Sequence, residues 1–179
     1  ETLSFFGAKT VLISGPTKIS PPSNVEFVSV ESSDEFLKKS IEKLPADVYI
    51  SVAAISDWKA KNISEKKLKK KTTFTSFDLE QSKDVLRSIC THKKRPKLVI
   101  GFSAETENLL KNSKKKFQIK QCDWMIANKI TKNYGFKSNK NKVFFIEENN
   151  IEEWKVMTKK LVARKLVKKI VSFFKNYKL

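Results

Sequence analysis

The sequence predicts an α/β fold in which a doubly wound, mostly parallel, Rossmann-like sheet is flanked by helices. Short runs rich in β-branched residues alternate with segments whose apolar residues recur at helical spacing. Several of these runs are apolar throughout, as expected of strands that are covered on both faces. The chain has 179 residues, of which 40% are hydrophobic, so it can bury a core and is not predicted to be disordered. We therefore expect one domain over residues 1–179.

The first half of the chain contains three predicted strands and one predicted helix. Residues 10–15 (TVLISG) form a β-branched run that ends at Gly15-Pro16, and residues 25–30 (VEFVSV) form a second one. Residues 32–44 begin with serines and an aspartate and continue with apolar residues at helical spacing, which predicts a helix. Residues 47–54 (DVYISVAA) have the composition of a strand buried on both faces.

The second half of the chain continues the alternation. Strands are predicted at residues 72–79, 97–104, 123–128 and 142–148, and helices at residues 82–90, 105–120 and 157–174. In the last of these helices the apolar residues lie broadly on one side and the lysines largely elsewhere. This pattern predicts a helix that docks on the sheet and exposes a basic face to water.

Cysteine and histidine are scarce. Cys90 and Cys122 are the only cysteines and form no CxxC pair, and His92 is the only histidine. A zinc site, a disulfide framework and a His-based triad are therefore not expected, and a reducing, cytoplasmic setting is favoured. The longest apolar runs are too short to cross a bilayer, so we expect no membrane association.

The chain is strongly basic, with 37 Lys and Arg residues against 19 Asp and Glu residues and a net charge of +18. Such an excess favours a polyanionic partner, but a solvated, lysine-rich surface would produce the same composition. Arginines are scarce, and neither an arginine-rich recognition helix nor an aromatic RNA-binding motif is present. We expect no nucleic-acid partner, and a basic nucleic-acid-binding α/β module remains the alternative.

Polar residues follow three of the predicted strands, in the segments AAISDWK (53–59), GFSAETEN (101–108) and ANKITKNYGF (127–136). Ligands of open α/β sheets bind beyond the carboxyl ends of the strands. Asp57 could hold a ribose hydroxyl or a metal-bound phosphate, and could equally serve as a turn or helix-cap residue. Lys116 and Lys120 lie four residues apart on one predicted helix, where either an anion or bulk water would relieve their repulsion.

The familiar glycine-rich phosphate-binding motifs are absent. The chain has only 4 glycines and contains neither GxGxxG nor GxxxxGK[ST], so P-loop chemistry and a dinucleotide-dependent reductase are unsupported. No nucleophile with a neighbouring base is evident. Any catalysis is therefore expected to depend on charge neutralisation and positioning.

The succession LISGP, AAISDWKAKNISEKKLKK, GFSAETE and DWMIANK, followed by GFKSN, resembles phosphopantothenate–cysteine ligase. This family often forms the C-terminal half of the bifunctional bacterial coenzyme A biosynthesis flavoprotein. The resemblance implies CTP-dependent ligation of 4′-phosphopantothenate with cysteine through an acyl-cytidylate, with Mg²⁺ on the phosphates. It also implies a homodimer or higher oligomer, with contacts near residues 72–79 and 137–148, and a fused or associated phosphopantothenoylcysteine decarboxylase.

The resemblance also implies roles for particular residues. It makes Lys67 the key lysine of a flap formed by EKKLKKK (65–71), which would close over the nucleotide and exclude water. Nucleotide contacts are implied for Ser51, Val52, Ala53, Asp57, Lys67, Lys83, Asp84, Val85, Leu86, Phe102, Lys116 and Lys120. Ala54 and Asn128 are implied to lie near the substrate, and Asp57 is the candidate for the metal.

The sequence departs from the family pattern in three places. Residues 81–85 read QSKDV where KNPDI is usual, and Lys129 stands where Asp is usual. The family's first strand with its glycine-rich turn, and its SNxSSG segment, would precede Glu1. We therefore expect the first βα unit to be missing from this chain, which is then N-terminally incomplete and inactive if that unit is essential.

Overall fold

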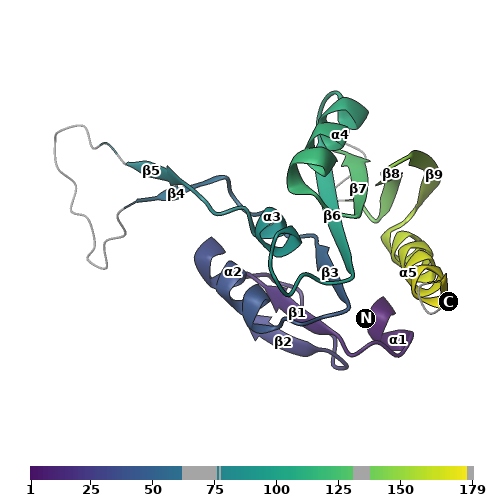
Figure 1. Cartoon of the computed structure of the whole chain (residues 1–179), viewed down its shortest axis with the longest axis horizontal. Coiled ribbons are helices and arrows are strands. Elements are labelled where there is room, and N and C mark those ends of the chain that lie inside the picture. The colour runs from purple at the N-terminus through teal and green to yellow at the C-terminus, as the bar shows by residue number, and fades with distance from the viewer. Residues whose placement is uncertain (62–75, 77, 131–137, 177–179) are drawn as a thin grey trace.

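The computed structural model describes residues 1–61, 76, 78–130 and 138–176 (Figure 1). Among these residues the main sheet has five strands in the order β3-β6-β7-β8-β9. Its parallel strands are β3 (Val48–Ser51), β6 (Leu98–Glu105) and β7 (Trp124–Lys129). The strands β8 (Lys140–Glu147) and β9 (Asn150–Thr158) continue it in antiparallel pairing. The sheet is therefore mixed, with a parallel and an antiparallel half.

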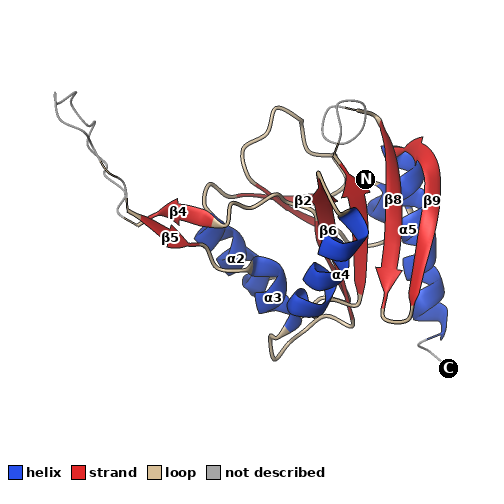
Figure 2. Cartoon of the chain, turned by 90° about the horizontal axis from the view of Figure 1, so that it is seen from above, coloured by secondary structure: helices blue, strands red, loops and turns tan. Residues whose placement is uncertain are grey.

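Two further strand pairs accompany this sheet. β1 (Val11–Ser14) and β2 (Glu26–Ser29) pair in parallel and form a sheet of their own. β4 (Trp58–Ala60) and β5 (Leu79–Gln81) pair in antiparallel orientation and project from the body of the molecule, as Figures 1 and 2 show. The base of the predicted flap is thus a β-ribbon.

Helices cover both faces of the main sheet. Successive side chains of a strand point to opposite faces, so one strand contributes to the buried layers on both sides. In β6, Leu98 belongs to one cluster of buried side chains and Val99 to another. The first cluster includes buried residues of α5 (Lys159–Asn176). The second includes buried residues of α3 (Val85–Cys90), among them Leu86 and Ile89, and side chains of α4 (Leu109–Lys120) pack against it. Figure 2 shows α5 behind β8 and β9, with α3 and α4 on the other side of the sheet.

The helix α2 (Ser33–Glu42) connects the β1-β2 pair to the rest of the molecule. Phe36 of α2 and Val85 of α3 belong to a third buried cluster, and Ile13 of β1 and Tyr49 of β3 pack against it. A serine caps the start of α2 by accepting a hydrogen bond from a main-chain N–H of its first turn. One helix layer therefore lies over strands of both sheets.

The α/β class predicted from the alternation of strands and helices is confirmed. The last helix docks as predicted, since three of its four buried residues belong to the buried cluster of the sheet: Val162, Leu166 and Ile170. A further short helix, α1 (Thr2–Phe5), was not predicted. In the described part of the chain, none of the helices has the length and apolar character needed to span a membrane.

Several boundaries differ from the predictions for physical reasons. β9 was missed because Trp154 is its only buried side chain, so the alternation that marks a strand is absent. The last helix begins at Lys159 rather than Met157, since the preceding residues belong to β9. β6 continues to Glu105, which delays the start of α4 to Leu109. Of the predicted strand at 72–79, only residues 76, 78 and 79 are described, and Leu79 is the first residue of β5.

Candidate functional site

The predicted site residues follow three parallel strands that end side by side. Ser51, the last residue of β3, lies opposite Gly101 of β6. Asn128 of β7 lies opposite Ala104 of β6, and Phe102 lies on β6 between these two positions. The structure therefore brings Ser51, Phe102 and Asn128 to one edge of the sheet, which is where ligands bind in open α/β sheets.

The chain that leaves β3 is exposed. Val52 is apolar but 62% exposed, and Ala53 and Ala54 are exposed as well. The main-chain carbonyl of Asp57 accepts a hydrogen bond from the main-chain N–H of Ser82 at 2.8 Å, so this segment lies beside the residues that precede α3. These exposed residues are accessible to a ligand at the end of β3.

Lys116 and Lys120 lie on α4, as predicted, and each contacts a carboxylate from another element. The Lys116 Nζ is 2.7 Å from Oε1 of Glu105, at the end of β6. The Lys120 ammonium donates to the carboxylate of Asp84. Asp84 also caps α3 by accepting a hydrogen bond from the main-chain N–H of Arg87 at 3.0 Å. The two lysines are thus tied to β6 and α3.

Glu105 is the most highly connected carboxylate of the site, and the sequence alone did not single it out. It accepts hydrogen bonds from Ser103 Oγ at 2.6 Å and from Asn112 Nδ2 at 3.4 Å, besides its contact with Lys116. Partial burial acts to raise the pKa of Glu105, but hydrogen bonds from Lys116 and Ser103 outweigh it, and the pKa lies below its ordinary value. Glu105 is therefore ionised at neutral pH.

Other predicted residues contribute differently. Val85 and Leu86 are core residues, only 3% and 9% exposed, so they can reach a ligand through main-chain groups alone. Lys83 is exposed and lies with Lys59 on the wall of a cavity of about 610 Å³ beside α2. Lys67, with the rest of EKKLKKK, lies outside the described residues, and its role stays a prediction.

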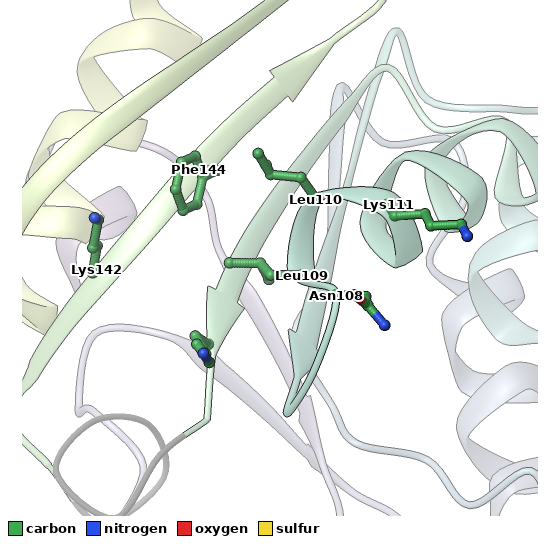
Figure 3. A pocket seen from close by; sticks show the side chains of 7 residues that line it. Asn108, Leu109, Leu110, Lys111, Lys142 and Phe144 are labelled. Carbon is green, nitrogen blue, oxygen red and sulfur yellow. The ribbon is translucent and has the colours of Figure 1, made fainter.

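A cavity of about 470 Å³ lies at the same edge of the sheet and is lined by Lys129, the last residue of β7 (Figure 3). Its lining combines apolar side chains with lysines: Asn108, Leu109, Leu110, Lys111, Lys129, Lys142 and Phe144. Figure 3 shows the side chains of Leu109 and Leu110 reaching from α4 toward Phe144 of β8. The cavity therefore offers apolar contact and positive charge beside the strand ends.

The metal prediction depends on Asp57. The described residues contain no group of three or more His, Cys, Asp or Glu side chains that could hold a metal ion. Asp57 is exposed and immediately precedes β4. Because Mg²⁺ is usually bound by one or two carboxylates together with substrate phosphates, a single aspartate suffices when the metal arrives on a nucleotide. Asp57 therefore suits Mg²⁺ that is bound together with nucleotide phosphates. The described residues do not form a magnesium site made of protein ligands alone.

Comparison with known proteins decides the family. The model of the DNA/pantothenate metabolism flavoprotein C-terminal domain matches residues 1–174. This chain belongs to that family. The resemblance that the motif succession predicts is thereby confirmed over nearly the whole chain.

Relatives of this family member agree with the assignment. The coenzyme A biosynthesis bifunctional protein CoaBC of Borreliella burgdorferi is 33% identical over 165 residues, which cover 90% of this chain and 42% of that protein. The corresponding protein of Bacillus subtilis is 29% identical over 174 residues, covering 95% of this chain and 43% of that protein. The chain thus spans less than half the length of these relatives.

Solved structures show the same fold. The crystal structure of the C-terminal domain of CoaBC superposes with a TM-score of 0.79 at 29% identity, covering 98% of this chain and 80% of that one. A Cab2 mutant in complex with phosphopantothenate-cysteine superposes with a TM-score of 0.64 at 16% identity, covering 86% of this chain and 54% of that one. At that identity the second likeness concerns the fold alone.

Proposed function

We propose that this domain joins 4′-phosphopantothenate to cysteine at the expense of CTP, giving 4′-phosphopantothenoylcysteine in coenzyme A biosynthesis. One observation carries the proposal. In a chain of this family, Lys116 is held by Glu105 at the end of β6, between the strands that bear Ser51 and Asn128, and Lys120 is held by Asp84 at the start of α3. Two lysine ammonium groups fixed in position suit the phosphates of a nucleotide better than the edge of a nucleic-acid base. The relatives are also named for coenzyme A biosynthesis.

The proposed reaction has two steps. The carboxylate of 4′-phosphopantothenate attacks the α-phosphate of CTP, which releases pyrophosphate and forms an acyl-cytidylate. The amine of cysteine then attacks the acyl carbon, loses a proton and displaces CMP. Charge builds up on phosphate oxygens in the first step, so Lys116 and Lys120 act by neutralising it and by orienting the nucleotide. Mg²⁺ bound near Asp57 would supply further neutralisation of the phosphates.

The acyl-cytidylate must be protected from water until cysteine arrives. The β4-β5 ribbon lies at the base of EKKLKKK, and Asp57 immediately precedes β4. We assign to Lys67 the role of closing over the nucleotide, as the family resemblance implies. A lid of this kind excludes water and completes the site only when substrate is bound.

Two partners follow from the same assignment. The ribbon exposes Trp58 at 57% and Leu79 at 59%, and exposed large apolar side chains of this kind are typical of interfaces. They support a homodimer or higher oligomer that involves this part of the chain. The relatives are named as bifunctional proteins, which supports a fused or associated phosphopantothenoylcysteine decarboxylase.

The test is CMP formation from CTP, Mg²⁺ and 4′-phosphopantothenate, with and without cysteine, beside a calorimetric titration with CTP. Cysteine-dependent CMP release supports the ligase. Saturable CTP binding without turnover would show that the nucleotide site is present and that residues outside 1–179 are needed. If neither turnover nor CTP binding appears, the proposal fails.

The net charge of +18 favours one alternative, a basic nucleic-acid-binding module. Such a module binds DNA with an affinity that falls steeply with salt and shows no preference for CTP. A titration with duplex DNA at two salt concentrations therefore separates the two functions. We expect DNA to bind weakly and CTP not to displace it.

A further inference from the structure

Glu105 is anchored more firmly than the lysine that it contacts. Its carboxylate accepts hydrogen bonds from Ser103 and Asn112, and its main-chain carbonyl accepts one from the N–H of Ile130 at 2.8 Å. Its side chain is 11% exposed, whereas that of Lys116 is 48% exposed. The carboxylate is therefore the fixed partner, and the long lysine side chain is the one whose freedom the contact restricts.

The contact belongs to a polar row along α4. Asn112, Lys116 and Lys120 follow one another at intervals of four residues and so lie on one face of the helix. Glu105 contacts the first two, and Asp84 contacts the third. Two carboxylates from different elements thus compensate the like charges of neighbouring lysines and set where each ammonium stands.

We propose that Glu105 is a positioning residue that holds the Lys116 ammonium at the carboxyl end of β6, ready for the phosphates of the nucleotide. The role of Glu105 in nucleotide binding rests on the proposed function, whereas its restriction of the Lys116 side chain does not. An ammonium has three N–H donors, so one can remain on Glu105 while the others bind phosphate oxygens. Because the lysine is ordered before the ligand arrives, less conformational entropy is lost on binding.

The first experiment needs no nucleotide. The full chain is treated with an amine-acylating reagent, and the acylation rate of each lysine is followed by mass spectrometry in wild type, Glu105→Gln and Glu107→Gln. Glu107 is a matched control, because it is an exposed carboxylate of the same segment and its side chain has no hydrogen bond or ion pair among the described contacts. We expect Lys116 to react about two- to fivefold faster in E105Q, as loss of a half-exposed ion pair implies, and unchanged in E107Q.

Equal Lys116 rates in wild type and E105Q would overturn the proposal. The neighbours Lys114 and Lys115 report any general loosening of α4, and a rise at all three lysines would also overturn it. If E105Q does not fold, Asn112→Ala replaces it, since that change removes a donor to Glu105 and leaves both charges in place. In N112A we expect a rise in the acylation rate of Lys116 alone, smaller than the rise expected in E105Q.

The second experiment is a double-mutant cycle on the dissociation constant of CTP with wild type, E105Q, K116M and the double variant. We expect E105Q to weaken binding about two- to fivefold when Lys116 is present and to have no effect when it is absent. Equal effects in both backgrounds would show that Glu105 does not act through Lys116. If wild type binds no CTP, the proposed function fails, and the acylation rates still decide whether Glu105 holds Lys116.

Discussion

Glu152 on β9 should stabilise the fold in a pH-dependent way, because two lysines of α5 hold its carboxylate. Oε1 is 2.7 Å from Lys165 Nζ and Oε2 is 3.0 Å from Lys169 Nζ. The same ammonium groups stand 4.5 Å and 4.3 Å from the ring centroids of Trp154 and Phe145. Hydrogen bonding from Lys165 is the main reason that the pKa of Glu152 is lowered from 4.5 to about 2. The carboxylate therefore ties α5 to the sheet.

The magnitude follows from the pKa. A pKa lowered from 4.5 to about 2 corresponds to about 3 kcal/mol at full strength, but the Glu152 side chain is 34% exposed and water screens the pair. We therefore expect Glu152→Gln to lower the free energy of unfolding by about 1–2 kcal/mol at pH 7. Because the folded-state pKa is depressed, this contribution is complete above pH 4.5 and is lost as the pH falls through about 2.

The assay is urea unfolding followed by circular dichroism at pH 7 and at pH 3, with midpoints and slopes compared. Glu153→Gln is the control, since Glu153 is 55% exposed and pairs with Lys142, and we expect it to cost less than about 0.5 kcal/mol. The difference in the free energy of unfolding between E152Q and wild type should be smaller at pH 3 than at pH 7. An E152Q variant as stable as E153Q at pH 7, or an E152Q deficit that does not change with pH, would refute the reasoning.

Three further outcomes are expected. Lys67→Gln should slow CMP release at least about a hundredfold without changing the thermal unfolding midpoint, whereas a wild-type rate would remove Lys67 from the mechanism. Gly101→Ala should lower the free energy of unfolding by about 1–3 kcal/mol in urea titrations, because its Cβ would stand 2.7 Å from Leu86 Cδ2; an unchanged midpoint contradicts this. Burial raises the pKa of the Cys90 and Cys122 thiols to about 12 and about 11, so iodoacetamide at pH 8 should alkylate them only after unfolding, and rapid native alkylation would disprove it.

The strands that were correctly predicted are those whose apolar pattern is strong enough to identify them locally. The predicted strands 97–104 and 123–128 contain uninterrupted apolar runs at residues 98–102 and 124–127, and both lie in the buried middle of the sheet as β6 and β7. β9 lies at the edge of the sheet, where one neighbour and a single buried tryptophan are enough to hold it. An edge strand can be mostly polar, so its sequence resembles a loop.

The same distinction separates the residues of the site. Lys116 and Lys120 could be placed on one helix face from their spacing alone, because the period of a helix is a local property. Their carboxylate partners could not be predicted in this way. Glu105 and Asp84 come from a different strand and a different helix, and 36 positions of sequence separate Asp84 from Lys120.

By itself, the sequence determined the α/β class, the family and the order of the segments that meet at the strand ends, since each depends on local patterns or on the succession of motifs. Only the tertiary structure decided that the sheet is half antiparallel, that Val85 and Leu86 are core residues, and that Glu105 holds Lys116. The physical reason is that strand pairing, burial and ion pairs depend on distances between residues far apart in the chain, which local periodicity does not encode.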